Sequence, residues 1–311
     1  MSLVKIPFIS IYYVSIYVLL NLSLSAGAAT LDEQICSNEK IQKLDLTSAE
    51  PQLLLREPLY GVTVDSVDHL NYIVRSLRSL PRMPTTRIVF DEFVPAKNYK
   101  KAVNEISRAS YVMGEILDSS AMSQYSWQEY RDRVIEYLEV LGPKVHIWEI
   151  GNEVNGEWLG DPSHVVKKVQ TAYDLVKSYK GKTALTLYYN ENCWMYPWEE
   201  MFQWAESKIP SYMKQGLDYV LVSYYESDCN NLKPDWKNVF DRLGQVFPNS
   251  KLGFGEVGTA IKSQKADYLR RYYTLPINHP RYIGGHFWWY FKQDMVPKKK
   301  PLWSVLKEVM E

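Results

Sequence analysis

The sequence predicts an α/β protein built as a single-domain (β/α)8 barrel. The chain has 311 residues, and one such barrel typically takes about 250. From about residue 60 onwards, short runs rich in β-branched and aromatic residues alternate with amphipathic segments. The apolar runs are nearly continuous, as expected for parallel strands that are covered on both faces. We therefore expect a closed parallel barrel over residues 58–311.

The expected strands follow one another at intervals that match one strand–helix–strand unit. In chain order they are Gly61–Val64, Arg87–Phe90, Tyr111–Ile116, Val145–Ile150, Thr183–Tyr188, Tyr219–Ser223, Lys251–Phe254 and Tyr282–Trp288. An open doubly wound sheet is the alternative. It usually opens with a glycine-rich phosphate loop after its first strand, and Thr63–Asp68 contains no glycine.

The helices between these strands are marked by their ends and by their apolar spacing. Ser126 and Glu129 match the capping-box pattern at a helix start. Apolar residues then recur at helical spacing, and Gly142-Pro143 ends that helix. A last helix is expected over Trp303–Met310.

The N-terminal residues 1–29 have the pattern of a signal peptide. Lys5 precedes an apolar stretch over residues 6–24, and Ala26-Gly27-Ala28 supplies small residues for cleavage. An uncleaved membrane anchor is the alternative, and this segment is the only predicted route to a membrane. Residues 30–57 are interpreted as an N-terminal extension. We expect a secreted or extracytoplasmic protein.

The three cysteines fit an oxidising compartment. Cys193 and Cys229 follow consecutive predicted strands, on loops that would be neighbours at one end of the barrel. A disulfide between them is a hypothesis, and Cys36 is left over.

The composition argues against a nucleic-acid partner and is compatible with a carbohydrate partner. Acidic and basic residues balance at 36 each, so no net field favours nucleic acid. The chain holds 24 Tyr and 10 Trp, whose flat apolar faces suit sugar rings, although a large aromatic core is the alternative explanation. We expect a monomer. Four tryptophans in predicted strand-to-helix loops suggest a sugar platform as a group, although any one of them is as likely to belong to the core: Trp158, Trp194, Trp198 and Trp236.

Two predicted core strands end in carboxylates. The fourth closes with Trp148-Glu149-Ile150-Gly151-Asn152-Glu153, and the seventh closes with Gly253-Phe254-Gly255-Glu256. A charged side chain at the end of a buried strand is costly unless it is used. Active-site groups of such barrels gather at the carboxyl ends of the strands, so we expect Glu153 and Glu256 to face each other there.

The fourth-strand motif resembles that of glycoside hydrolase clan A, the four-over-seven barrel superfamily. The resemblance implies a retaining glycosidase in which Glu153 is the acid/base and Glu256 the nucleophile. It implies that Asn152 holds the hydroxyl next to the reacting carbon. It also implies that Arg87 and Tyr225 contact the nucleophile.

The resemblance leaves some positions open. Ser223 stands where several clan families have a histidine. Trp288 or Trp289 matches the tryptophan that floors the cleavage subsite, and Trp158 is a further candidate for binding substrate. Arg87 could instead pair with Asp91 or Glu92.

Three further acidic residues lie near the ends of predicted strands. Glu149 is expected to support the site from behind, with a structural ion pair as the alternative. Glu226 and Asp228 could line the cleft or cap the next helix. The histidines show no metal-ligand spacing, so we expect neither a metal nor an organic cofactor.

The sequence thus predicts hydrolysis of O-glycosidic bonds in a poly- or oligosaccharide by double displacement. Arg87 and Tyr225 should lower the pKa of Glu256, whereas Glu153 should be the raised acid. We expect a pH optimum on the mildly acidic side. Two alternatives remain open: a transglycosylase on the same residues, and a barrel that binds polysaccharide without cleaving it.

Overall fold

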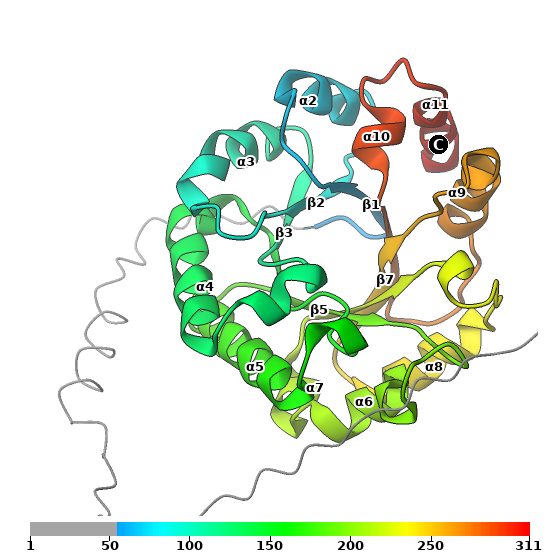
Figure 1. Ribbon diagram of the computed structural model, residues 1–311. Coiled ribbons are helices and arrows are strands. Elements are labelled where there is room, and N and C mark those ends of the chain that lie inside the picture. The colour runs from blue at the N-terminus through cyan, green and yellow to red at the C-terminus, as the bar shows by residue number, and fades with distance from the viewer. Residues whose placement is uncertain (1–54) are drawn as a thin grey trace, which may run out of the picture. The chain divides into compact units, whose positions relative to one another are not determined.

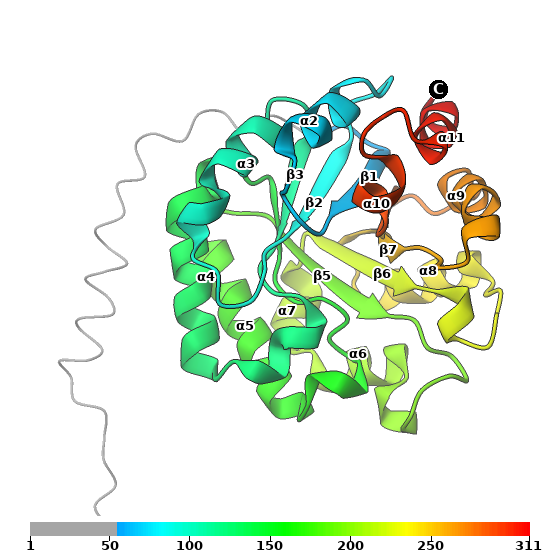
Figure 2. The ribbon, with the colours of Figure 1, turned by 45° about the horizontal axis from the view of Figure 1, so that its top comes forward.

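The computed structural model describes residues 55–311. Its strands are all parallel and form a closed eight-stranded barrel in chain order, so the predicted fold class is confirmed. Figures 1 and 2 show the helices arranged around the outside of the barrel. The predicted signal peptide (1–29) and nearly all of the predicted extension (30–57) lie outside the described residues.

The strands occur where the sequence predicts them, with small shifts at their ends. Two of these shifts affect the candidate site. The fourth strand ends at Glu149, four positions before Glu153, and the seventh continues past Phe254 and includes Glu256. The strands are β1 (Leu59–Val64), β2 (Thr85–Val89), β3 (Tyr111–Glu115), β4 (Ile147–Glu149), β5 (Thr183–Tyr188), β6 (Tyr219–Tyr224), β7 (Lys251–Val257) and β8 (Tyr282–Trp288).

The helices begin and end for the reasons visible in the sequence. Ser126 and Glu129 form both hydrogen bonds of the capping box at the start of α4. The last helix, α11, begins at Pro301 rather than at Trp303. The helices are α2 (Leu70–Arg78), α3 (Lys100–Ile106), α4 (Trp127–Leu141), α5 (Pro162–Ser178), α6 (Met201–Lys208), α7 (Ser211–Gly216), α8 (Trp236–Val246), α9 (Lys265–Tyr273), α10 (Phe291–Met295) and α11 (Pro301–Met310).

Two apolar clusters stabilise the barrel. The larger one joins the outer faces of the strands to the helices and contains many of the aromatic residues, including Trp148 and Trp204. The smaller one includes the first residues of β1, β4 and β6, which are Leu59, Ile147 and Tyr219. Polar side chains are therefore free to occupy the other end of the barrel. No helix among residues 55–311 has the length and apolar character needed to cross a membrane.

A bulge in β8 sets the position of the segment that follows it. The pairing of β7 with β8 shifts between Leu252 and Phe254. Gly285, opposite Phe254, has φ 90°, and an added Cβ would lie 2.3 Å from the Phe254 carbonyl oxygen, so only glycine fits there. Beyond the bulge, the Trp289 amide donates to the Val257 carbonyl at 3.0 Å. This bond places Trp289 beside the end of β7.

Candidate active site

Glu153 and Glu256 line one cavity of about 290 Å³ at the carboxyl ends of the strands. Both side chains are nearly buried, with 9% and 5% of each residue exposed. The cavity is lined by Asp118, Ser119, Asn152, Glu153, Tyr225, Ser227, Asp228, Glu256, Ala260, Trp289 and Tyr290. The two predicted carboxylates therefore share one solvent-accessible space.

Glu153 lies in the turn after β4, with its backbone in the left-handed region at φ 48°. A non-glycine residue there is uncommon and costs free energy, so the surrounding structure must hold it. Two hydroxyls fix its carboxylate. Ser223 Oγ donates to Oε1 at 2.6 Å, and Ser119 Oγ donates to Oε2 at 3.0 Å.

Glu256 lies within β7, one residue before the strand ends. Arg87 Nη1 donates to its Oε2 at 2.7 Å, and the Tyr225 hydroxyl donates to its Oε1 at 2.6 Å. Each carboxylate oxygen thus has its own donor. Arg87 comes from the middle of β2, and Tyr225 directly follows β6.

Arg87 is fully buried beneath the cavity and holds more than one carboxylate. Its Nε donates to Glu149 Oε2 at 2.6 Å, and Nη2 donates to Glu149 Oε1 at 3.3 Å. Thr186 donates to the same Oε1. Glu149 therefore supports the site from behind, as expected. The alternative that Arg87 pairs with Asp91 or Glu92 is wrong.

Glu115, at the end of β3, is a third buried carboxyl beside Arg87. Its Oε2 lies 3.1 Å from Arg87 Nη2, but neither of its oxygens makes a hydrogen bond. Burial raises the pKa of Glu115 well above its usual range, and Arg87 only partly opposes this. Burial therefore favours the uncharged form of Glu115. Glu115 was not among the predicted site residues, although it lies at the end of an apolar strand, which is the feature that identified Glu153 and Glu256.

The electrostatics separate the two predicted catalytic carboxyls. Burial, followed by the charge of Glu256, raises the pKa of Glu153 to about 8. Burial also raises the pKa of Glu256, while Arg87 and the Tyr225 hydroxyl oppose the rise. The prediction of a lowered pKa for Glu256 is therefore wrong in its net direction, because removal from water outweighs both donors. The prediction that the pKa of Glu153 is raised is supported.

Asn152 and Trp289 line the cavity, whereas Trp288 does not. Asn152 is 1% exposed, and its side chain makes no hydrogen bond to any described residue. The Trp289 ring lies over the Arg87 guanidinium at 5.7 Å. Trp288 is fully buried, and its indole nitrogen donates to Asp294 at 3.1 Å. The structure thus places Trp289 at the cavity and Trp288 in the core.

The loop tryptophans fall into different environments. Trp158 is 40% exposed and packs edge-on against Tyr188, outside the lining of the cavity. Trp198 is 50% exposed and stacks on Tyr196. Trp236 is buried in the aromatic core, which is the alternative left open for each of these tryptophans.

Short strand-to-helix segments supply residues that the sequence analysis did not single out. Asp118 caps the short 3-10 helix Ser119–Gln124 and so places Ser119 beside Glu153. Of the two acidic residues left open after β6, Asp228 lines the cavity. Glu226 instead pairs with Arg271 and accepts a hydrogen bond from Tyr272. Asp118 and Ser119 lie a few residues after the end of β3, and this position was the signal in the sequence that could have identified them.

Cys193 and Cys229 form a disulfide, as hypothesised. It joins the loop after β5 to the loop after β6. Cys229 directly follows Ser227 and Asp228, which line the cavity. The bridge therefore anchors one wall of the candidate site. Cys36 lies outside the described residues.

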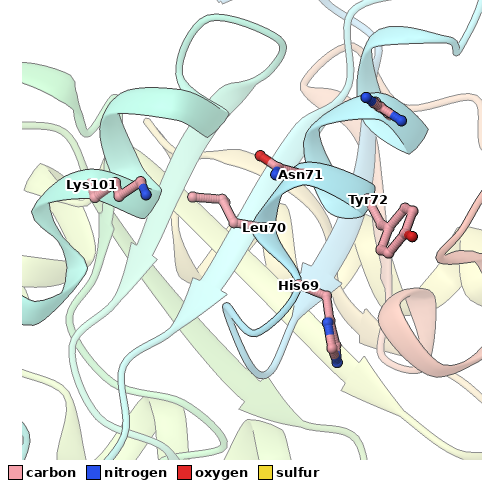
Figure 3. A pocket seen from close by; sticks show the side chains of 6 residues that line it. His69, Leu70, Asn71, Tyr72 and Lys101 are labelled. Carbon is pink, nitrogen blue, oxygen red and sulfur yellow. The ribbon is translucent and has the colours of Figure 1, made fainter.

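A second hollow, of about 440 Å³, lies by α2 and includes Lys101 of α3 (Figure 3). It is lined by His69, Leu70, Asn71, Tyr72, Arg75 and Lys101, and it contains no carboxylate. It is therefore unsuited to acid–base chemistry by paired carboxyls. Residues 55–311 also contain no group of three or more His, Cys, Asp or Glu arranged to hold a metal ion.

Comparison with known proteins places the fold beside one set of solved structures. A crystal structure of ScGas2 in complex with a compound superposes with a TM-score of 0.56 at 14% identity, covering 82% of this chain and 63% of that one. Saccharomyces cerevisiae Gas2p with laminaritriose and laminaritetraose gives a TM-score of 0.53 at 14% identity, over 81% of this chain and 63% of that one. This chain therefore spans less than two thirds of those proteins. No family model and no curated protein sequence matches the chain.

Proposed function

We propose that this protein is a retaining glycoside hydrolase, with Glu256 as the nucleophile and Glu153 as the acid/base. The observation that carries the proposal is that two carboxyl groups in one cavity have different hydrogen-bond donors. Glu256 is held by the two strong donors Arg87 and Tyr225, while Glu153 is held by two serine hydroxyls. A guanidinium favours the ionised form that a nucleophile needs, and the raised pKa of Glu153 favours the protonated form that an acid needs.

The first step forms a glycosyl-enzyme ester. An oxygen of Glu256 attacks the anomeric carbon while the bond to the leaving oxygen breaks, and Glu153 gives its proton to that oxygen. The charge on Glu256 disappears in the ester. Because that charge is the second-largest cause of the raised pKa of Glu153, the pKa of Glu153 falls at this point.

The second step releases the sugar. Glu153, now ionised, takes a proton from water, and the resulting hydroxide oxygen attacks the anomeric carbon and frees Glu256. The configuration at the carbon is inverted twice and therefore retained. A sugar hydroxyl can replace water with the same proton transfers, which would make the protein a transglycosylase. Product analysis separates these two outcomes.

The first substrates to test are β-linked glucans. Laminari-oligosaccharides are bound in Gas2p structures of similar fold, including a glutamate-to-glutamine variant with laminaritetraose and laminaripentaose. Asn152 offers its amide oxygen, which has no hydrogen-bond partner among residues 55–311, to a ligand in the cavity. Trp289 contributes an apolar ring to the same wall. Both features suit a sugar, which presents hydroxyls at its edge and an apolar face.

We also propose that the protein works outside the cytoplasm. The Cys193–Cys229 disulfide is a type of bond that persists in oxidising compartments. This agrees with the interpretation of residues 1–29 as a signal peptide.

Azide rescue tests the two catalytic assignments separately. The Glu256→Gly variant should lose about a thousandfold or more in kcat, and azide should restore turnover of an activated aryl β-glycoside with an α-glycosyl azide as the product. The Glu153→Ala variant with the same azide should give the β-glycosyl azide instead, because its nucleophile is intact.

The control is Glu92→Gly, which changes an exposed glutamate outside the cavity and should leave activity unchanged. Failure of azide to rescue Glu256→Gly, or recovery of the β-azide from that variant, would count against the assignment of Glu256. Oligosaccharide binding without any product from the wild-type protein would favour the non-catalytic alternative.

A further inference from the structure

We propose that the cavity selects sugar units without negative charge, and that Asp118 and Asp228 determine this specificity. Substrates would be neutral sugars or sugars with a free amino group, whereas uronic acids and sulfated sugars would be rejected. The inference rests on the proposed function, because it concerns the substrate of the same cavity.

The cavity wall contains acidic residues and no basic ones. Four of its eleven lining residues are acidic, namely Asp118, Glu153, Asp228 and Glu256, and none is basic. The proposed mechanism uses only Glu153 and Glu256. Asp118 and Asp228 therefore add negative charge that the chemistry does not require.

The two cations that lie over aromatic rings of the cavity wall are already paired. Arg87 lies behind Trp289 and holds Glu149 and Glu256. Lys265 lies over the Tyr290 ring, on which its Nζ approaches to 4.1 Å, and it donates to both oxygens of Asp294 at 2.7 and 2.8 Å. Neither cation can turn to a substrate carboxylate without breaking a partly or fully buried ion pair. An anionic sugar would thus meet repulsion that neither Arg87 nor Lys265 compensates.

Asp118 and Asp228 each have one carboxylate oxygen without a hydrogen-bond partner among residues 55–311. Asp118 uses Oδ1 to accept from the amide and hydroxyl of Ser120. Asp228 uses Oδ1 to accept from the Ser227 hydroxyl at 2.9 Å. Oδ2 of each residue makes no hydrogen bond to any residue between 55 and 311. Both free oxygens are acceptors, so they suit a hydroxyl or an ammonium group and oppose a carboxylate.

A buried, uncharged group in the same cavity is also without a partner. Asn152 is 1% exposed, and its Oδ1 accepts no hydrogen bond from the described residues. Burying an unpaired acceptor costs free energy, so a donor on the ligand is expected to satisfy it. This acceptor and the free oxygens of Asp118 and Asp228 all favour a ligand rich in donors.

The test compares matched polymers on the full-length protein. A neutral β-glucan, mannan or xylan that the protein cleaves is oxidised at C6, or substituted with glucuronate in the case of xylan, and kcat/KM is measured for both forms. The wild type should prefer the neutral form by about tenfold or more at low ionic strength, and about 1 M salt should reduce this preference by screening. The Asp118→Asn/Asp228→Asn variant should lower the ratio of kcat/KM for the neutral polymer to kcat/KM for the charged polymer by about tenfold.

The ratio is used because both forms are measured on the same variant, so a general loss of catalytic rate cancels. Asn can still cap the segment that follows position 118. The charge-matched control is Asp241→Asn/Asp267→Asn on the outer helices α8 and α9, which should keep the wild-type ratio. Equal cleavage of both forms, or an unchanged ratio in Asp118→Asn/Asp228→Asn, would overturn this inference alone. Cleavage of no polymer at all would overturn the proposed function and this inference with it.

Discussion

Ser223 donates its hydroxyl to Oε1 of Glu153 at 2.6 Å, although the two residues are separated by 70 positions. Ser223 is also the β6 residue paired in register with Glu256 on β7. Neighbouring strands lie about 4.8 Å apart, so this serine connects the segments that carry the two carboxyls. Its position is the one at which several families of the resembled clan have a histidine. Here a neutral hydroxyl occupies this position and contacts Glu153.

Replacing Ser223 by alanine should change the pH dependence as well as the rate. The Ser223 hydrogen bond lowers the pKa of Glu153 against the effect of burial, so its removal should raise that pKa further. The alkaline limb of the kcat/KM profile should therefore move to higher pH. The maximum should fall by about tenfold, since a hydrogen bond to a carboxylate is lost. Ser207→Ala on α6 is the control, and an unmoved alkaline limb would contradict the role of Ser223.

The wild-type protein should have a bell-shaped pH profile. Glu153 must be protonated and has a pKa of about 8 in the free protein, so activity should fall as the pH rises past that value. Glu256 must be ionised and its pKa is raised by burial, so activity should fall when the pH drops towards that raised pKa. The optimum should lie between the limbs, closer to neutral than the sequence analysis predicts. The measurement is kcat/KM as a function of pH. A kcat/KM that does not change between about pH 4 and pH 9 would exclude Glu153 and Glu256 as the catalytic pair.

Arg87→Met should destabilise the fold by about 3–5 kcal/mol at neutral pH. The variant leaves Glu149 and Glu256 without their buried cation. Arg87 opposes the raised pKa of Glu256, so its removal raises that pKa further above the unfolded value; the penalty is therefore present at high pH and disappears as falling pH protonates Glu256. Urea unfolding at several pH values should show the difference from wild type shrinking towards low pH. Arg271→Met, whose side chain is 40% exposed and pairs with Glu226, should cost about 1 kcal/mol or less.

The barrel was predictable because its signals are local and repeat. A capping box at Ser126, continuous apolar strands and regular spacing each depend on neighbouring residues only. The positions of Glu153 and Glu256 were also visible, because a charge at the end of a core strand is costly. Asn152 and Arg87 were expected from the resemblance alone, and they too lie at or beneath the cavity.

The parts that sequence could not supply depend on register and on burial. Trp288 and Trp289 are adjacent, and only the β8 bulge decides which of them faces the cavity. The net pKa of Glu256 depends on desolvation, which no residue pattern reports. Ser119 reaches Glu153 through a turn whose geometry is set by the cap at Asp118. These features arise only when distant segments are packed together.

Alanine substitution should distinguish the two tryptophans clearly. Trp289→Ala removes a ring from the cavity wall and should lower kcat/KM by about tenfold to a hundredfold with little change in stability. Trp288→Ala removes a fully buried side chain and should lower the free energy of unfolding by about 3–5 kcal/mol. Thermal melts and kinetics on both variants provide the comparison. A large loss of stability in Trp289→Ala with unchanged kinetics would reverse the two assignments.

Removing the Cys193–Cys229 disulfide should weaken both the fold and substrate binding. The bridge closes a loop with a sequence separation of 36, for which the chain-entropy model predicts a stabilisation of about 2–4 kcal/mol. It also anchors the segment that carries Ser227 and Asp228 into the cavity, so KM should rise more than kcat falls. The Cys193→Ser/Cys229→Ser variant should therefore melt at lower temperature, and dithiothreitol should shift the wild type to the same midpoint while leaving the variant unchanged. If the reductant shifts both proteins equally, the effect comes from elsewhere and the bridge does not support this wall.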